Sequence, residues 1–154
     1  PGLLPVLPAV LARVGRLCDL ACDPHAVASV LGPLAAEAPG MRVPGAFEIP
    51  VVAAEFAHAS WRRPHAVICL GVILRGETTH ADYIGRGVTD ALIHLQIQTR
   101  VPMIHEVLLL ENEEQARIRC LSRDHNRGAE AAQTALEMAS LVRRWRDPDD
   151  DVPF

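Results

Sequence analysis

Residues 65–74 of the chain read HAVICLGVIL, and residues 75–83 continue as RGETTHADY. The first run is apolar on both of its faces, which predicts a strand buried inside a parallel sheet. After the polar run, apolar residues recur at helical spacing from about residue 80 to residue 99. A buried strand that leads directly into a helix is typical of an α/β domain.

Two more stretches predict strands of the same sheet. Residues 102–110 (PMIHEVLLL) form an apolar run that His105 and Glu106 interrupt, and residues 40–42 suit a short strand. Because strands and helices alternate along the chain, we expect one α/β domain over residues 1–146, with helices covering a parallel sheet.

The clearest helix lies near the end of the chain. Asn126 is a suitable N-cap, and small apolar residues form one stripe that ends at Val142. Further helices are expected over residues 23–38 with a kink at Gly32-Pro33, from Pro50 to Ser60, and over residues 113–119.

The first forty residues give the weakest pattern. Residues 13–21 (RVGRLCDLA) suit a first strand, although Arg16 and Asp19 are unfavourable in a central one. Residues 1–12 are apolar and broken by prolines, so we expect an arm that lies against another surface, such as a neighbouring subunit. Residues 147–154 (DPDDDVPF) are expected to form an acidic, mobile tail.

Composition narrows the class of protein. The 154 residues are 49% hydrophobic and 22% charged, which is the balance of one globular domain. A net charge of −4 without a basic stripe argues against a nucleic-acid partner, and no apolar run is long enough for a membrane span. Cys69 is expected to be a buried, reduced thiol, and we expect a cytoplasmic protein. Cys18, Cys22 and His25 do not have the spacing of a zinc site, so we expect no metal.

The polar run after the first quoted strand is the best candidate for a binding site. Ligands of open α/β sheets bind beyond the carboxyl ends of the strands, where helix N-termini present free N–H groups. Gly76 permits close backbone approach, and Thr78 and Thr79 supply hydroxyls. The run therefore suits an anion site, although a plain strand-to-helix turn gives the same pattern. His80 is placed to exchange protons with a ligand there, or is simply a residue at the start of a helix.

Two other clusters suit ligand binding. Residues 43–50 (VPGAFEIP) expose Phe47 and Glu48 in a turn, a combination that fits a flat, hydrogen-bonding ring or only caps a helix. Arg119, Arg123 and Arg127 are natural partners for a phosphate, or solvated residues at helix ends.

Three blocks carry a resemblance to a known family. VPGAFEIP at 43–50, LGVILRGETTHADY at 70–83 and NRGAEAAQTALEMASL at 126–141, in this order and spacing, resemble the lumazine synthase family. The resemblance covers about two thirds of the chain. It implies condensation of 5-amino-6-(D-ribitylamino)uracil with 3,4-dihydroxy-2-butanone 4-phosphate to 6,7-dimethyl-8-ribityllumazine, without a cofactor. The fold expected with it is a three-layer, flavodoxin-like domain with a four-stranded parallel sheet in the order 2-1-3-4.

The resemblance also implies roles for particular residues. The phosphate would be bound by the loop and an arginine, and His80 would transfer protons. Glu130 would steady the arginine and the phosphate pocket. The phosphate set is Gly76, Glu77, Thr78, Thr79 and Arg119. The set expected for the ring and the ribityl chain is Ala46, Phe47, Glu48, Val72, Ile73 and Leu74.

The chain departs from the family pattern at the ring site. The alignment places Ala21-Cys22 where the family has Phe-Asn at the end of its first strand. His105-Glu106 replaces Phe-Gly in the fourth strand, and Leu109-Leu110 replaces a threonine pair. Ala21 and His105 would then replace two phenylalanines that line the ring site in the family. This replacement predicts weak binding of the aminouracil. The alternative is a catalytically weakened homologue that binds flavin or lumazine or forms a structural shell.

The resemblance further implies a homo-oligomer. We expect a pentamer around an alanine-lined helix bundle, or a shell built from pentamers, with each site shared between neighbours. His105 and the residues of the first strand would come from a different subunit than His80.

Overall fold

The computed structural model describes residues 9–12, 29–31, 40–60, 63–122, 124 and 126–146. The elements with defined bounds are β1 (Ala9–Ala12), β2 (Gly40–Val43), the 3-10 helix η3 (Ala46–Glu48), α2 (Ile49–His58), β3 (Val67–Leu74), α3 (His80–Thr99), β4 (Met103–Leu110), α4 (Glu113–Leu121) and α5 (Arg127–Arg146). For β2, α2, β3, α3, β4 and α4, the ends predicted from the sequence agree with these bounds to within two residues.

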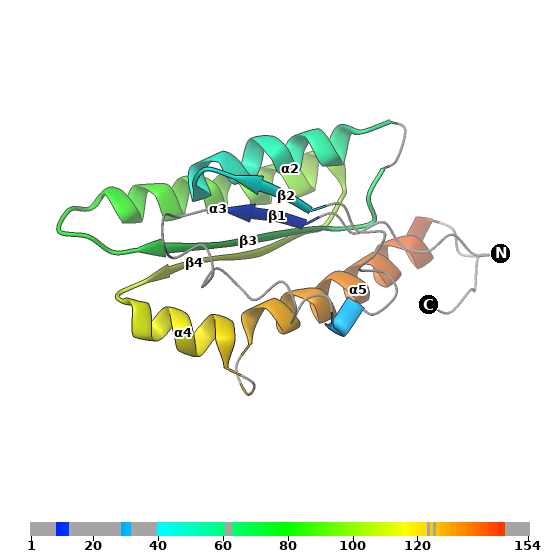
Figure 1. The fold of residues 1–154 in the computed structure, drawn as a ribbon. Coiled ribbons are helices and arrows are strands. Elements are labelled where there is room, and N and C mark those ends of the chain that lie inside the picture. The colour runs from blue at the N-terminus through cyan, green and yellow to red at the C-terminus, as the bar shows by residue number, and fades with distance from the viewer. Residues whose placement is uncertain are drawn as a thin grey trace.

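The strands form one parallel sheet in which β1 pairs with both β2 and β3, and β3 pairs with β4. The register aligns Ala9 with Ile68 and Val67 with Met103. All four strands run the same way, so their carboxyl ends share one edge (Figure 1). The predicted α/β class with a parallel sheet is confirmed.

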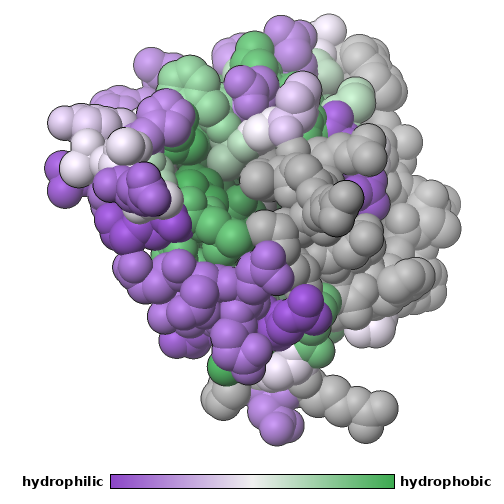
Figure 2. Space-filling view, turned by 60° about the vertical axis from the view of Figure 1, so that its left-hand side comes forward, coloured by the Kyte–Doolittle hydropathy of each residue, from purple (hydrophilic) through white to green (hydrophobic). Residues whose placement is uncertain are grey.

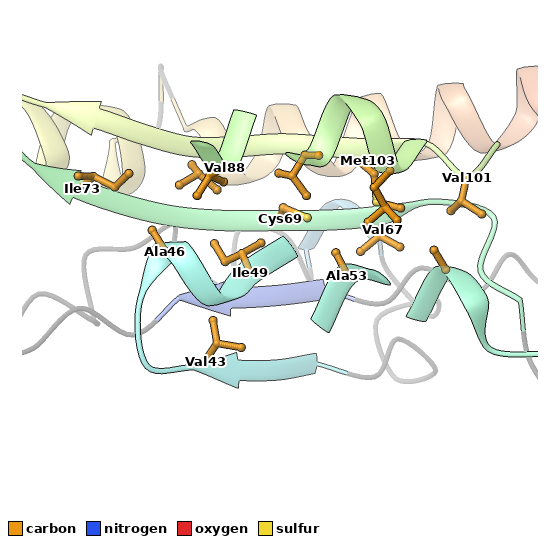
Figure 3. Packing of buried hydrophobic residues seen from close by; sticks show 14 of the residues in the cluster. Val43, Ala46, Ile49, Ala53, Val67, Cys69, Ile73, Val88, Val101 and Met103 are labelled. Carbon is orange, nitrogen blue, oxygen red and sulfur yellow. The ribbon is translucent and has the colours of Figure 1, made fainter. Parts of the chain in front are cut away.

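The alternation of side chains along β3 divides the core into two layers. Val67, Cys69 and Ile73 face α2 and α3 in one cluster, which Figure 3 shows from close by. Ile68, Leu70 and Val72 face the other way, toward α4 and α5, whose buried residues are alanines, Gly128 and Cys120. Figure 1 shows the result, with one helical layer on each face of the sheet.

Local chemistry explains where the helices begin. The Asn126 side chain accepts a hydrogen bond from the Ala129 N–H at 3.1 Å, which caps α5 as predicted. The Asn112 side chain accepts one from the Gln115 N–H at 2.9 Å and caps α4. At its other end α3 stops at Arg100, which has a left-handed backbone with φ of 55°.

The first part of the chain requires a correction. The first described strand is Ala9–Ala12, so these four residues of the expected arm belong to the sheet. Residues 13–21, the expected first strand, lie outside the described residues. Of the helix predicted over 23–38, residues 29–31 are helical and the others lie outside the described residues. Ala21, Cys18, Cys22, His25 and the segment 147–154 also lie outside them.

The described residues bear on two other predictions. They contain no helix long and apolar enough to cross a membrane. Within the same ranges, no group of three or more His, Cys, Asp or Glu side chains is arranged to hold a metal ion. Cys69 is a free, buried cysteine as predicted, and burial raises the pKa of its thiol to about 12.

Candidate functional site

The loop between β3 and α3 lies at the carboxyl edge of the sheet, and all its residues from Arg75 to His80 are exposed. In the part of the chain that the structure describes, the N–H groups of Gly76, Glu77 and Thr78 have no hydrogen-bond acceptor. A Cβ placed on Gly76 would meet no atom within 4 Å, so the space above this residue is open. The loop therefore presents free backbone donors at the start of a 20-residue helix, which is a favourable place for an anion.

Figure 2 shows the molecule turned so that this loop end comes forward. Apolar residues are exposed in the middle of this view, with hydrophilic residues along their left and lower sides.

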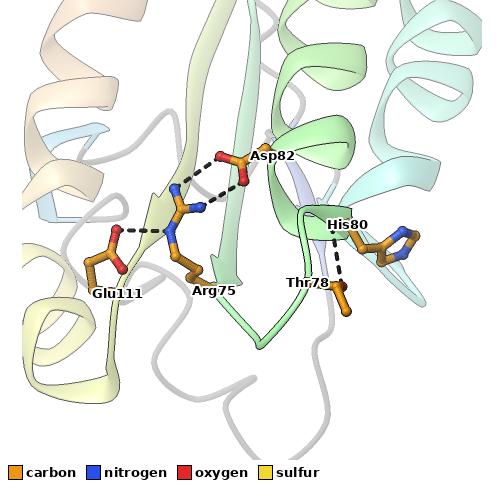
Figure 4. Close-up of polar contacts among 5 residues, drawn as sticks. All are labelled: Arg75, Thr78, His80, Asp82 and Glu111. Carbon is orange, nitrogen blue, oxygen red and sulfur yellow. Dashed lines mark hydrogen bonds and ion pairs between the residues drawn. The ribbon is translucent and has the colours of Figure 1, made fainter.

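His80 is the first residue of α3. Its backbone N–H bonds weakly to the Thr78 hydroxyl oxygen at 3.4 Å, while its ring points away from Arg75 (Figure 4). Among the described residues, the exposed imidazole makes no hydrogen bond or ion pair, so it is free to exchange protons with a bound molecule.

Arg75 holds the base of the loop. Its Nη1 and Nη2 atoms donate to the two carboxylate oxygens of Asp82 at 2.7 and 3.0 Å, and its Nε donates to Glu111 at 2.9 Å. These bonds hold the pKa of the Asp82 carboxyl below its ordinary value. This cluster, drawn in Figure 4, was not expected from the sequence, because no local spacing relates residue 75 to residue 111.

The turn after β2 supplies the second group of predicted residues. Ala46 is buried, whereas the Phe47 side chain is 61% exposed and lies next to Gly87 of α3. The carboxylate of Glu48 folds back over Gly45 and lies 2.8 Å from the position that a Cβ on this glycine would take. Phe47 and Glu48 are therefore both exposed after β2, at the same edge as the loop.

Val72, Ile73 and Leu74 end β3, directly before the loop. The side chains of Val72 and Ile73 are buried in the two opposite core layers. The pairing of β3 with β1 ends at Leu70 among the described residues. On that side, the described strands give the backbone groups of residues 72–74 no partner strand.

Arg119 lies elsewhere, on α4. It lines a pocket of about 490 Å³ together with Leu110, Gln115 and Ile118, and it has no hydrogen-bond or ion-pair partner among the described residues. α4 packs on the opposite face of the sheet from α3. One chain therefore does not bring Arg119 and His80 together.

Glu130 was expected to steady Arg119, and here the structure gives a different partner. The Glu130 carboxylate accepts a bond from Arg127 Nη1 at 2.6 Å, one helical turn away on α5. In the described chain Glu130 therefore neutralises Arg127 and leaves Arg119 unpaired. Arg123, the third arginine of the predicted cluster, lies outside the described residues.

His105 and Glu106 point to opposite faces of the sheet, because they are neighbours in β4. His105 Nε2 lies 3.0 Å from the Thr89 hydroxyl of α3. Glu106 is on the α5 side, where burial raises the pKa of its carboxyl, Arg127 lowers it and Glu130 raises it further. The two side chains cannot contact the same ring in one chain.

With this geometry in place, the comparisons with known proteins are informative. The sequence model of the family described as 6,7-dimethyl-8-ribityllumazine synthase matches residues 26–143, which are 118 of the 154 residues. The chain belongs to the lumazine synthase family. Proteins named 6,7-dimethyl-8-ribityllumazine synthase from two Clostridium kluyveri strains are 42% identical over 101 residues. The match covers 66% of this chain and 64% of each relative, so it spans slightly less than two thirds of their length.

The lumazine synthase match includes the loop, His80, Arg119 and Glu130, but it begins after β1 and after Ala21. Ala21 lies outside the described residues, and the described part of the first strand, Ala9–Ala12, ends nine residues before it. A second family model, described as the AlkA N-terminal domain, matches residues 2–48. It covers less than a third of the chain and overlaps the lumazine synthase match over residues 26–48, so it assigns no family.

Proposed function

We propose that this chain condenses 5-amino-6-(D-ribitylamino)uracil with 3,4-dihydroxy-2-butanone 4-phosphate to 6,7-dimethyl-8-ribityllumazine, a step of riboflavin biosynthesis, without a cofactor. The observation that carries the proposal is the exposed loop 76–80, with its free N–H groups and His80, in a chain of the lumazine synthase family. The comparisons do not favour the alternative of a binding or shell protein without turnover, because the curated relatives carry the name of the synthase.

The phosphate has donors of two kinds. The backbone N–H groups of Glu77 and Thr78, near the N-terminus of α3, suit its oxygens, and the Thr79 and Thr78 hydroxyls add further donors. Arg119 suits the same anion because its guanidinium has no partner among the described residues and can donate two parallel bonds. Because Arg119 and the loop belong to opposite faces of the sheet, we propose that Arg119 reaches the site of a neighbouring chain.

The reaction requires proton transfers at several steps. The amine of the uracil adds to the ketone, and loss of one water gives an imine. Elimination of inorganic phosphate and closure of the second ring, with loss of another water, then complete the product. His80 is the group proposed to carry these protons, because its ring is exposed and an imidazole exchanges protons near neutral pH.

The ring and ribityl chain of the aminouracil are proposed to bind beside the loop. Phe47 offers an exposed aromatic face, and Glu48 accepts hydrogen bonds from ring N–H groups. The backbone edge of Val72, Ile73 and Leu74 provides further donors and acceptors. His105 is the proposed substitute for an aromatic wall; its bond to Thr89 fixes the imidazole plane.

The proposal includes an oligomeric state and a cellular compartment. Sites shared between neighbours require a homo-oligomer, and we propose a pentamer, or a shell built from pentamers, of flavodoxin-like subunits. The order 2-1-3-4 is part of this proposal, and the parallel pairing of β1 with both β2 and β3 supports it. The free, buried Cys69 suits the reducing cytoplasm.

One steady-state assay tests the function. Each substrate is varied in turn while the absorbance of the lumazine product is followed. We expect product formation that saturates at ordinary concentrations of the butanone phosphate and at higher concentrations of the aminouracil. No product at any concentration would contradict the proposal. A mass measurement in solution tests the shared site separately, because a stable monomer with full activity is incompatible with it.

A further inference from the structure

Arg75 occupies a particular place in the fold. It is the first residue after β3, and its backbone N–H donates to the Leu110 carbonyl at 2.8 Å, at the end of β4. Its side chain then bonds Asp82, in the first turn of α3, and Glu111, two residues before α4. One residue therefore links the ends of two strands to the starts of the helices on both faces of the sheet.

The guanidinium of Arg75 is already engaged by two carboxylates. Each of its three nitrogen atoms donates to a carboxylate oxygen. The three side chains together carry a charge of −1, so they present no excess positive charge to a phosphate. Arg119, which lacks such partners among the described residues, is the contrasting case.

Stability alone does not account for this cluster. The side chains are 35% (Arg75), 30% (Asp82) and 58% (Glu111) exposed, so solvent screens the ion pairs, although a bidentate pair within a charge network contributes more than a single exposed pair. What the cluster does fix is geometry. A bidentate arginine–carboxylate pair holds both groups in one plane and at one separation. The loop 76–79 is closed between Arg75 and Asp82, so its two ends are held a fixed distance apart.

We propose that Arg75 is a positioning residue for the reaction, acting through Asp82 and Glu111. The pair with Asp82 sets the course of the loop that presents the N–H groups of Glu77 and Thr78, and it orients the helical turn that carries His80. The bond to Glu111 fixes the start of α4, the helix of Arg119. The inference rests on the proposed function, because it assigns Arg75 to the same site.

The first experiment compares the kinetics of Arg75→Lys with those of the unchanged chain. Lysine keeps the charge but not the planar fork, so the two bonds to Asp82 cannot both form. We expect kcat/KM for the butanone phosphate to fall on the order of 10- to 100-fold, because a misplacement of reacting groups by about 1 Å causes a loss of rate of this size. The melting temperature should change little. Arg117→Lys is the matched control, since Arg117 makes an exposed pair with Glu113 at 3.8 Å on α4.

A second variant separates position from charge. The triple variant Arg75→Gln, Asp82→Asn, Glu111→Gln removes all three charges and therefore leaves no unpaired carboxylate beside the phosphate. If Arg75 positions the loop, the triple variant stays impaired. Recovery of normal kinetics in the triple variant would overturn the inference. The whole role of Arg75 would then be to neutralise the negative charges of Asp82 and Glu111. Normal kinetics in Arg75→Lys would overturn it equally.

A binding measurement keeps this inference separate from the proposed function. If the unchanged chain forms no lumazine, the proposed function fails, and titration with inorganic phosphate then tests Arg75 alone. Weaker phosphate binding in Arg75→Lys than in Arg117→Lys supports the positioning role. Equal binding in the two variants overturns it.

Discussion

The two faces of the sheet carry different parts of the proposed chemistry. On the α3 face, Arg75 bonds two carboxylates, and the His80 ring has no partner among the described residues; on the α4 face, Arg119 has no such partner either. An arginine held by two carboxylates fixes the geometry around it, whereas one without such partners is able to bind an anion. In the proposed reaction, one face would therefore arrange the loop and supply proton transfer, and the other would supply positive charge.

The largest effect is expected on the α3 face. His80→Ala should lower kcat about 10²- to 10⁴-fold, the usual contribution of a positioned acid or base, with little change in KM for either substrate. Steady-state kinetics across pH 5 to 9 would measure it. If KM rises and kcat is retained, His80 binds substrate and does not transfer protons.

On the α4 face the expected effect is on binding. Arg119→Ala removes a charge-assisted contact, which corresponds to roughly a 10- to 100-fold rise in KM for the butanone phosphate. The KM for the aminouracil should stay nearly unchanged, since that substrate carries no phosphate. Equal loss for both substrates would show that Arg119 supports the fold and not the ligand.

Co-expression of the two variants tests whether His80 of one chain and Arg119 of a neighbouring chain form one site. In co-expressed His80→Ala and Arg119→Ala subunits, about a quarter of the shared sites would contain both native side chains, because each site draws one from each neighbour. Activity well above that of either variant alone is therefore expected, measured per total subunit. Each variant co-expressed with itself is the control. Activity that does not exceed the mean of the two would place both residues in the same chain.

The sequence predicted the middle and end of the fold well. β3 and α3 were recognisable because a run apolar on both faces passes directly into a helical pattern, and α5 because Asn126 caps it. The exposed loop and His80 followed from the rule that ligands bind at the carboxyl ends of parallel strands. These predictions depend on signals that lie within about twenty residues of one another.

β1 was not predicted as a strand, for an equally physical reason. It has four residues, too few for a periodic pattern, and Pro5 and Pro8 precede it. The longer run at 13–21 therefore gave the stronger strand signal. β1 also lies before residue 26, where the match to the lumazine synthase model begins.

The polar contacts that join different helices and strands could not be predicted from the sequence either. Arg75 meets Glu111 only because β3 and β4 are neighbours in register, from Val67 with Met103 to Leu74 with Leu110. Glu130 pairs with Arg127 and not with Arg119 because α5 places the first two on one turn. Such pairings depend on the packed fold.

The smallest expected effect is on stability and concerns Glu106. Its carboxyl is half-buried on the α5 side of β4, and burial is the main cause of its raised pKa, with Arg127 opposing and Glu130 adding to it. A carboxyl whose pKa is higher in the folded chain than in the unfolded one stabilises the fold fully only below the unfolded value. This stability is lost as the pH rises through the folded value. The ionised Glu106 therefore disfavours the native state at neutral pH.

Glu106→Gln removes the ionisation and keeps the shape of the side chain. We expect it to raise the melting temperature at pH 7 by roughly 1–2 °C, since the group is only half-buried, and to change it little at pH 4, where Glu106 is protonated. Thermal unfolding at both pH values measures the difference. Glu114→Gln, in the exposed first turn of α4, is the control; it should lower stability slightly at pH 7, because an acid there favours the helix dipole. A lower melting temperature for Glu106→Gln at pH 7 would mean that attraction to Arg127 outweighs the cost of burial. The α5 face would then hold its carboxylate as firmly as the α3 face holds Asp82.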